Sequence, residues 1–370
     1  MRMLFIVRYN STLSPENEVF EKHMLSLEKR ATFSLATLFS LRMLGLFMIL
    51  PVFTPFAKNL PGTTPFLIGL ALGIYGLTQA IFQLPFGALS DHFPRKNIIA
   101  IGFIIFIIGS ITAALSHTIM GIIIGRALQG AGAVGSTIIA LLSDLTRPEQ
   151  RSKSMAITGM IIGFAFFMAL LIGPFLNTII GILGIFWLSA GLGCIALLLI
   201  YFWVPTPDHA VKIKPSEPFL KNLKKLLKHP ELLSLDLGIF LLHAVLMATF
   251  AVIPLYVHAS WNYAVPLILS VFFTFKFMKY IRTAIIGLII AELILWQFHM
   301  NQALLLLGLF LFFTAFNILE ANLPSLVSRI APPNLKGTAI GVYSTCQYLG
   351  IFVGGLLGGF ILRGLLNHVI

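Results

Sequence analysis

The chain has 370 residues, of which 58% are hydrophobic and only 10% are charged. Ordinary soluble domains carry about 25% charged residues, and a soluble globule of this composition would have to expose large apolar patches. The composition therefore excludes an ordinary soluble protein and predicts an all-α protein that crosses a membrane many times.

Residues 1–33 are expected to form a cytoplasmic N-terminal segment. Their apolar run at residues 3–7 is too short for a signal peptide, and Glu16, Glu18 and Glu21 follow it. Met24 offers an alternative translation start, so either Met1 or Met24 can begin the protein.

Eleven segments have the apolar character of membrane-spanning helices, which need about 20 residues each. They lie at about 34–57, 65–89, 98–116, 118–142, 154–180, 183–204, 232–257, 263–280, 283–299, 302–327 and 337–362. Open strands are excluded, because lipid cannot satisfy the hydrogen bonds of their backbone.

Lysine and arginine residues outside these segments fall almost entirely in alternate loops. The loops on the other side contain only Lys58 and Arg363. Because cytoplasmic loops carry the excess of positive charge, the pattern places the N-terminus in the cytoplasm of a multi-pass protein of the cell (inner) membrane. The net charge of +12 follows from this topology, and no nucleic-acid partner is expected.

Residues 205–231 form the longest predicted connection. They separate an N-terminal bundle of six spans at 34–204 from a truncated C-terminal bundle of about five at 232–370. Apolar residues recur there near a helical period, among lysines, at Phe219, Leu220, Leu223, Leu226 and Leu227. We interpret the segment as a basic cytoplasmic linker helix that lies on anionic lipid. A helix that docks on another protein is the alternative.

The two bundles share an internal repeat. LLSDLTRPEQRSKSMAI begins at Leu141, and LVSRIAPPNLKGTAI begins at Leu326, six predicted spans later. Both stretches lead from the end of an apolar helix through a proline-bearing loop to Ala-Ile and a glycine-rich helix. The repeat predicts two parallel units of six helices with the last helix missing, and a substrate site near the midplane between them.

Three motifs resemble those of the major facilitator superfamily. GALSDHFPRKN at 87–97 is similar to the signature between its second and third helices, with His92 and Pro94 in place of a cation and a glycine. GRALQGAGA at 125–133 resembles its fourth-helix motif, and GFAFFMALLIGP at 163–174 resembles the fifth-helix motif of drug/proton antiporters. The chain is identified as a transporter with the major facilitator fold, of the drug/proton antiporter type and most similar to its YajR-like members.

The resemblance implies a conformational latch, to which Gly87, Asp91, Arg95, Lys96 and Asp144 would belong. In the family, the aspartate of this loop faces the N-terminus of the eleventh helix, and the arginine pairs with an acid that ends the fourth. Carried over, Asp91 would meet the helix that starts at 336–338, and Arg95 would pair with Asp144. Such contacts would bridge the two bundles on the cytoplasmic side and favour an outward-open state.

Polar groups within the spans mark the expected proton and substrate pathway, because a charge at the bilayer centre costs about 2.5–3.5 kcal/mol on insertion scales. The candidates are Arg42, Arg126, His243, Asn317 and Glu320. The resemblance ties Arg126 to proton transfer or substrate. Glu320 is the best titratable candidate, three residues from Asn317 on one helix face. The alternatives are that Arg42 reaches the membrane interface, and that His243 and Glu320 are structural hydrogen-bonding groups.

The fifth span carries residues expected to serve helix packing and kinking, namely Gly163, Gly173 and Pro174. The sequence contains no Walker loop, zinc-ligand spacing or nucleophile motif, and Cys194 and Cys346 lie far apart in apolar segments. We therefore expect no enzyme activity, no cofactor and no metal.

The function predicted from the resemblance is secondary active transport by a monomer, with proton-coupled efflux of small amphipathic compounds. Two alternatives stay open, a proton-coupled importer and a transport-inactive membrane protein. The second depends on the crowded eighth and ninth spans at 258–299 and on the short RGLLNHVI after the eleventh span, where a twelfth would need about 20 residues.

Overall fold

The computed structural model describes residues 23–206, 219–257, 264–277, 280–332 and 335–367. Residues 1–22 of the predicted N-terminal segment and 207–218 of the predicted linker lie outside the described residues. The described part of the chain is helical apart from turns and short connections, and it contains no strand.

The described part of the N-terminal half consists of seven helices. They are α2 (Ser26–Phe47), α3 (Leu50–Ala57), α4 (Pro65–His92), α5 (Arg95–Ala114), α6 (Ile119–Ala131), α7 (Gly135–Asp144) and α8 (Pro148–Phe202). Local sequence explains where several of them begin. The Thr64 and Thr118 side chains accept hydrogen bonds from backbone N–H groups at the starts of α4 and α6, and a proline opens α4 and α8.

The C-terminal half follows the short helix α9 (Phe219–Leu226). Its helices are α10 (Pro230–Val252), which continues into the 3₁₀ turn η1 (Ile253–Leu255), α11 (Ala264–Phe277), α12 (Ile281–Phe298), α13 (Gln302–Ile330) and α14 (Lys336–Asn367). The Asn301 side chain caps the start of α13 by accepting from two backbone N–H groups.

These helices match the eleven predicted spans. Nine helical stretches of the described residues are long and apolar enough to cross a membrane, with α2–α3, α6–α7 and α10–η1 each counted as one. Helix α8 contains two of the predicted spans, joined at Gly181, whose φ of 66° suits a residue without a Cβ. The described part of α11 corresponds to the predicted eighth span. The all-helical fold with about eleven spans is therefore confirmed.

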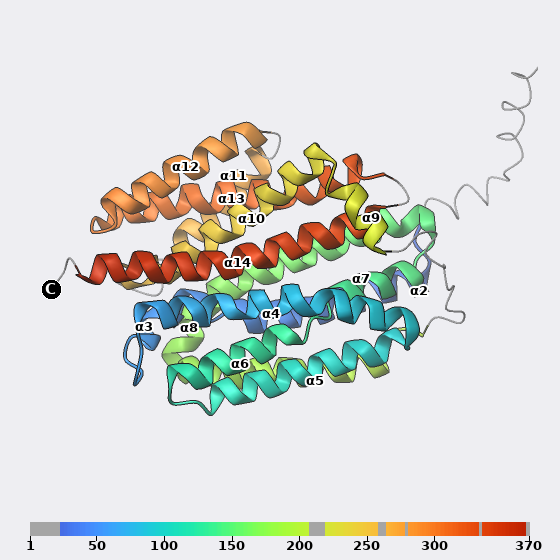
Figure 1. Ribbon diagram of the computed structural model, residues 1–370, viewed down its shortest axis with the longest axis horizontal. Coiled ribbons are helices and arrows are strands. Elements are labelled where there is room, and N and C mark those ends of the chain that lie inside the picture. The colour runs from blue at the N-terminus through green and yellow to red at the C-terminus, as the bar shows by residue number, and fades with distance from the viewer. Residues whose placement is uncertain (1–22, 207–218, 258–263, 278–279, 333–334, 368–370) are drawn as a thin grey trace, which may run out of the picture.

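The two halves meet along α4 and α14, which run side by side through the middle of the molecule (Figure 1). The backbones touch there because glycines face each other. A Cβ on Gly69 would lie 2.2 Å from the carbonyl oxygen of Gly355, and one on Gly73 would lie 2.7 Å from that of Phe352. Such close approach is typical of small residues at helix interfaces in membranes.

The halves also touch at the end of the molecule that carries α3, which we call the α3 end. There, Thr54 Oγ1 donates a hydrogen bond to the Phe250 carbonyl at 3.4 Å, and α3 packs on α10 and η1. The opposite end carries α9 and is called the α9 end (Figure 1).

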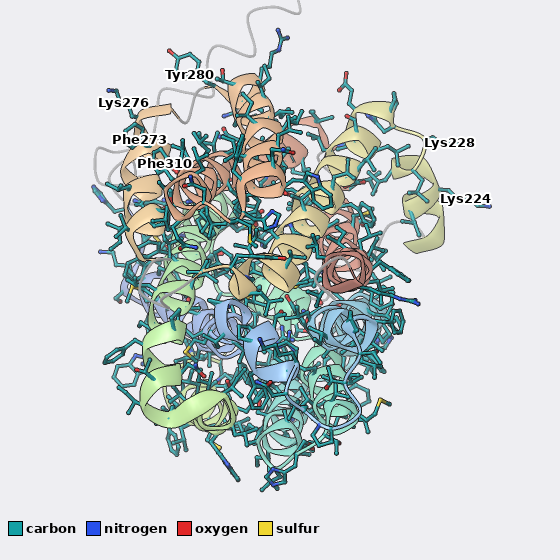
Figure 2. All side chains as sticks on the ribbon, turned by 90° about the vertical axis from the view of Figure 1, so that its left-hand side faces the viewer. Lys224, Lys228, Phe273, Lys276, Tyr280 and Phe310 are labelled. Carbon is teal, nitrogen blue, oxygen red and sulfur yellow. The ribbon has the colours of Figure 1, made fainter. Side chains whose placement is uncertain are left out.

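Helix α9 lies at the margin of the bundle, with Lys224 and Lys228 directed away from it (Figure 2). Leu226 is buried and α9 packs against α14, whereas Leu227 is 47% exposed. Only part of the predicted apolar face of α9 therefore packs against the rest of the C-terminal half.

At another margin of the same view, the Phe273 and Phe310 rings meet edge to face at 5.1 Å and join α11 to α13.

Candidate functional site

Arg126 of α6 is completely buried, and backbone carbonyls solvate its charge. Its Nε donates to the Ala71 carbonyl and its Nη2 to the Leu72 carbonyl, both at 3.3 Å. Its Nη1 donates to Gln129 Oε1 at 3.2 Å, and the guanidinium lies 4.4 Å from the centre of the Tyr75 ring. These contacts hold a permanent charge between α4 and α6 without a carboxylate among the described residues.

Arg42 of α2 is also buried, but its hydrogen bonds are incomplete. Its Nη2 donates to Gln79 Oε1 and, at 3.4 Å, to the Gln129 carbonyl. Its Nε and Nη1 have no hydrogen-bond partner in the described part of the chain. The side chain is 1% exposed, so the alternative in which it extends to the membrane interface does not hold in this conformation. We call Arg42, Tyr75, Gln79, Arg126 and Gln129 the N-half cluster.

In the C-terminal half, Glu320 of α13 lies between α10 and α14. Its Oε1 accepts from Gln347 Nε2 at 3.2 Å, and its Oε2 lies 3.8 Å from His243 Nε2. Oε2 accepts no hydrogen bond from the described residues. His243 Nδ1 faces the Ile239 carbonyl at 3.3 Å, which favours the tautomer whose Nε2 accepts from Gln347 at 2.8 Å. We call His243, Glu320 and Gln347 the C-half cluster.

Asn317, the other candidate on α13, does not join this cluster. Its Nδ2 lies 3.5 Å from Ser270 Oγ of α11. A spacing of three residues on one helix face therefore did not bring Asn317 and Glu320 to the same partners. Glu292 of α12, also within a span, accepts from Thr249 Oγ1 of α10 at 3.0 Å, apart from both clusters.

An aromatic row connects the two clusters across the boundary between the halves. Starting at Tyr75, its successive members are Phe47, Phe166, Phe316 and His243, with ring centres 6.3, 4.9, 5.9 and 5.6 Å apart. The step from Phe166 of α8 to Phe316 of α13 crosses from one half to the other with the rings stacked. The row thus places flat apolar surfaces between a permanently cationic cluster and an acidic one.

The latch loop lies between α4 and α5 and makes two strong contacts. Arg95 Nε donates to Asp144 Oδ2 at the end of α7 at 2.5 Å, so the structure brings this predicted pair together. Arg95 Nη1 also donates to Ser90 Oγ at 3.0 Å. Gly87 is in ordinary contact with Ser136 of α7, since a Cβ there would lie 3.5 Å from its Oγ.

Of the two remaining latch residues, Asp91 does not make its expected contact, and no partner had been predicted for Lys96. The Asp91 side chain is 61% exposed and pairs with Arg95 at 3.5 Å, and no polar contact joins it to the described start of α14 at Lys336. Lys96 binds the C-terminal end of α8, where Nζ donates to the Val204 carbonyl at 2.6 Å and to Thr206 Oγ1 at 3.0 Å.

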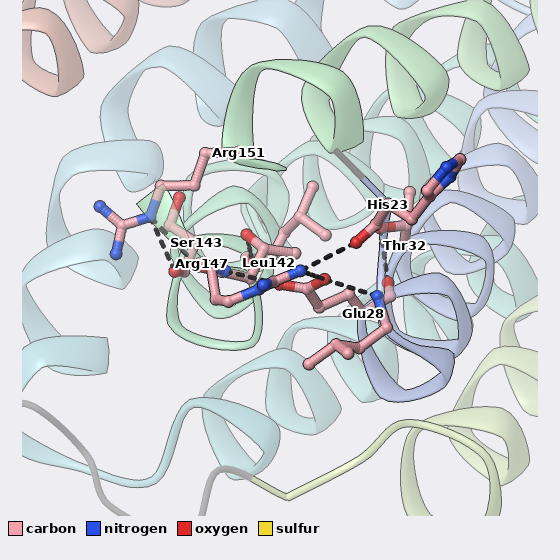
Figure 3. A network of polar contacts seen from close by, with 9 residues as sticks. His23, Glu28, Thr32, Leu142, Ser143, Arg147 and Arg151 are labelled. Atoms are coloured by element: carbon pink, nitrogen blue, oxygen red, sulfur yellow. Dashed lines mark hydrogen bonds and ion pairs between the residues drawn. The ribbon is translucent and has the colours of Figure 1, made fainter. Parts of the chain in front are cut away.

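A buried carboxylate at the start of α2 was not among the predicted site residues (Figure 3). Glu28 Oε1 accepts from both the backbone N–H and the Nε of Arg147, each at 2.9 Å, and Oε2 accepts from Arg147 Nη2 at 3.1 Å. Arg147 Nη2 also donates to the His23 carbonyl at 2.9 Å. This network fastens the start of α2 to the loop between α7 and α8.

The glycines expected to pack the fifth span differ from each other. A Cβ on Gly173 would lie 2.1 Å from the Met48 carbonyl oxygen, which requires glycine there. Gly163 is exposed, and a Cβ on it would meet nothing within 4 Å of the described atoms, so close packing at Gly163 is not observed. Pro174 is buried inside α8, where the residue with non-helical dihedral angles is Gly181.

Several residues of the site had not been picked out from the sequence. They are Tyr75, Gln79, Gln129 and Gln347, together with the phenylalanines of the row. Glutamines within apolar spans would have been a usable signal, because an amide in lipid needs a partner. The phenylalanines had none, since the chain contains 33.

Two helical halves that enclose buried charges at their common boundary define a membrane transporter of two bundles. The chain belongs to the Major Facilitator Superfamily, whose family model matches residues 35–355. It is 44% identical over 353 residues to the inner membrane transport protein YajR of Escherichia coli K12, covering 90% of this chain and 78% of that protein.

More distant proteins share the same fold. The quinolone resistance protein NorA of Staphylococcus aureus is 26% identical over 342 residues, with 85% of this chain and 86% of that protein covered. A bacterial homologue of the human lysosomal transporter Spinster, in an inward-facing and occupied conformation, aligns with a TM-score of 0.77 and 16% identity. That alignment covers 94% of this chain and 84% of the other.

Proposed function

We propose that this protein exports small amphipathic compounds in exchange for protons, by alternating access between its two halves. The observation that carries the proposal is the aromatic row with a charged cluster at each of its ends. Stacked rings bind the apolar part of a compound, and the flanking charges bind its polar part. The drug resistance named for the NorA relative supports a cargo of this kind.

Glu320 is the proposed proton carrier. The Glu320 side chain is 37% exposed, but its Oε2 atom is buried and has no hydrogen-bond donor in the described residues to stabilise a negative charge there. Arg126 is proposed to hold the site's fixed positive charge, since arginine does not lose its proton in proteins. The protein needs no cofactor for these steps, and its activity is transport and not catalysis.

The proposed orientation places the N-terminus and the α9 end in the cytoplasm of the inner membrane. The basic residues near that end, such as Arg95, Lys96, Arg147 and Lys336, support it. With this orientation the halves touch on the outer side, through Thr54 and through the glycines of α4 and α14, so the conformation faces the cytoplasm.

The latch is proposed to form fully only in the outward-open state. Arg95 and Asp144 keep the loop attached to the N-terminal half throughout the cycle. When the cytoplasmic side closes, Asp91 would reach the N-terminus of α14, whose helix dipole favours a negative charge.

The test is to measure accumulation of fluorescent amphipathic compounds in cells with and without the protein, at two external pH values. Export predicts lower accumulation in the cells that contain the protein, with a larger difference at acidic external pH. Accumulation that rises with the protein and with the proton gradient would indicate an importer. Accumulation that is the same in cells with and without the protein, at both pH values and with the protein present in the membrane, would indicate that it does not transport these compounds.

A further inference from the structure

The fourth span is interrupted near its middle. Helices α6 and α7 together form one stretch long enough to cross a membrane, but residues 132–134 between them are not helical. Close packing holds the interruption in place, since a Cβ on Gly132 would lie 2.3 Å from the Gly102 carbonyl oxygen of α5. Helix α7 therefore begins inside the bundle, where it packs against α2 and α4.

The start of α7 carries backbone N–H groups without acceptors. Those of Gly135, Ser136 and Thr137 have no backbone acceptor in the described part of the chain, and no side chain caps the helix. Gly135 and Thr137 are buried within a span, where little water is available to accept instead. Unpaired N–H groups at a helix start attract negative charge, and interrupted helices of membrane transporters bind anionic groups in this way.

Two side chains beside this helix start also have unused donors. Arg42 and Gln79 are at most 1% exposed, and Arg42 Nη2 donates to Gln79 Oε1, which leaves Gln79 Nε2 on the other side of the amide. Gln79 Nε2, Arg42 Nε and Arg42 Nη1 make no hydrogen bond of normal length with a described residue. Gln79 Nε2 lies 4.0 Å from the position of a Cβ on Gly135, so this donor faces the start of α7.

The positive charge around these donors is not balanced within the described residues. Arg42 and Arg126 share Gln129, whose carbonyl accepts from Arg42 and whose Oε1 accepts from Arg126. Neither arginine forms a salt bridge with a described residue. Because a buried charge without a partner is costly, two permanent cations at this place favour the binding of an anion.

The space beside Gly135 limits the size of that anion. A Cβ there would lie 3.4 and 3.5 Å from two edge atoms of the Phe39 ring, which is ordinary van der Waals contact. One atom of the size of a methyl group therefore fits, and a chloride ion is about that large. The edge of an aromatic ring carries partial positive charge, which suits an anion. A carboxylate, with three heavy atoms, would require Phe39 to move.

We propose that a chloride ion binds between the start of α7, Gln79 Nε2 and the Arg42 guanidinium. The ion balances part of the charge of the two buried arginines. The stability of the protein then depends on chloride itself and not only on ionic strength. The site lies in the N-terminal half, and its existence does not depend on the transport activity proposed above.

The first experiment measures the thermal midpoint of the full-length protein in detergent while gluconate replaces chloride at constant ionic strength. Chloride should raise the midpoint until the site is saturated, because a ligand that binds only the folded state stabilises it. Bromide, which is also monatomic, should act in the same way, and acetate should not. Equal midpoints in chloride and gluconate would overturn the site. Stabilisation by acetate as large as that by chloride would overturn the choice of ion.

The second experiment fills the space without removing a polar group. Gly135→Ala places a methyl group where the ion would lie, and Gly163→Ala is the matched control, with no described atom within 4 Å of its Cβ. Both variants add one atom and raise helix propensity by a similar amount. Gly135→Ala should lose the response of the midpoint to chloride, whereas Gly163→Ala should keep it. The same response in both variants would contradict the proposed position of the ion.

The third experiment supplies the negative charge from the protein. Gln79→Glu keeps the shape of the side chain, puts an oxygen in place of Nε2 and allows a charge-assisted pair with Arg42. At neutral pH this variant should be as stable in gluconate as the unmodified protein is in chloride, and chloride should not stabilise it further. Continued stabilisation by chloride, or a midpoint in gluconate below that of the unmodified protein, would overturn the proposal.

Discussion

The two halves of the molecule share one architecture but carry different kinds of buried charge. The N-terminal half buries Arg42 and Arg126, which stay positively charged at every physiological pH. The C-terminal half places His243, Glu292 and Glu320 within its spans, and each of these can gain or lose a proton. One half therefore supplies a fixed charge and the other a variable one, and the proposed proton coupling depends on this asymmetry.

The largest effect on this comparison between the two halves is expected from removal of the fixed charge of Arg126. Arg126→Ala leaves the Ala71 and Leu72 carbonyls and Gln129 without their donor. A hydrogen bond to a charged group contributes about 1.5–3 kcal/mol and this variant loses several, so we expect proton-driven flux to fall by about 100-fold or more. Flux in proteoliposomes, normalised to the amount of protein inserted, measures this. Arg126→Lys, which keeps the charge but cannot donate in several directions, should restore only part of the flux. Full activity of Arg126→Ala would show that Arg126 is structural.

The role of Glu320 as the group that gains and loses a proton is tested by Glu320→Gln, with Glu292→Gln as the matched control. Both replacements remove a carboxylate from a span of the same half, but Glu292 contacts Thr249 and lies outside the two clusters. We expect Glu320→Gln to abolish the response of flux to a pH gradient, whereas Glu292→Gln keeps it. Uptake assays at several external pH values distinguish the two. Loss of pH dependence in both variants would mean that the acids act together and that Glu320 has no special role.

The boundary between the halves is tested by adding side chains to glycines. Gly69→Val places methyl groups where the Gly355 backbone lies, and overpacking of this kind costs about 1–3 kcal/mol. Gly163→Val adds the same atoms at a position with no described atom within 4 Å of a Cβ. We expect the first variant to lower the thermal midpoint in detergent and the second to leave it unchanged. Destabilisation by Gly163→Val alone would indicate that the helices meet differently.

The last comparison is between two ion pairs at the α9 end of the N-terminal half, of which the more exposed pair should give the smallest effect. Glu28 is almost fully buried against Arg147, so Glu28→Gln should cost about 1–3 kcal/mol of stability. Asp144 and Arg95 are partly exposed, with 24% and 21% of their side chains accessible, so Asp144→Asn should cost about 0.2–1 kcal/mol. Thermal midpoints measured in low and high salt compare the two. A larger loss for Asp144→Asn would show that the latch contributes more than its exposure indicates.

The spans could be predicted because apolar length is a local property of the sequence. The pairing of Arg95 with Asp144 followed from motifs that specify both partners. The faces that converge at the site could not be predicted, because a helix in lipid is apolar on all sides and gives no period that marks its inner face. Phe47, Phe166 and Phe316 are therefore indistinguishable in the sequence from phenylalanines that face lipid. Asp91 illustrates another limit, since a motif specifies a contact that the described residues do not make in this structure.

The contacts at the end of α8 have a consequence for how the two halves are kept together. Arg30 and Lys96 donate to the carbonyls of Trp203 and Val204, directly after α8, so the last described residues of the N-terminal half are held against that half itself. A chain divided between Thr206 and Phe219 would lose the covalent link that raises the effective concentration of one half near the other, but none of the described contacts between the halves. Their association would then depend on the abundance of each piece in the membrane, as in a complex of two subunits.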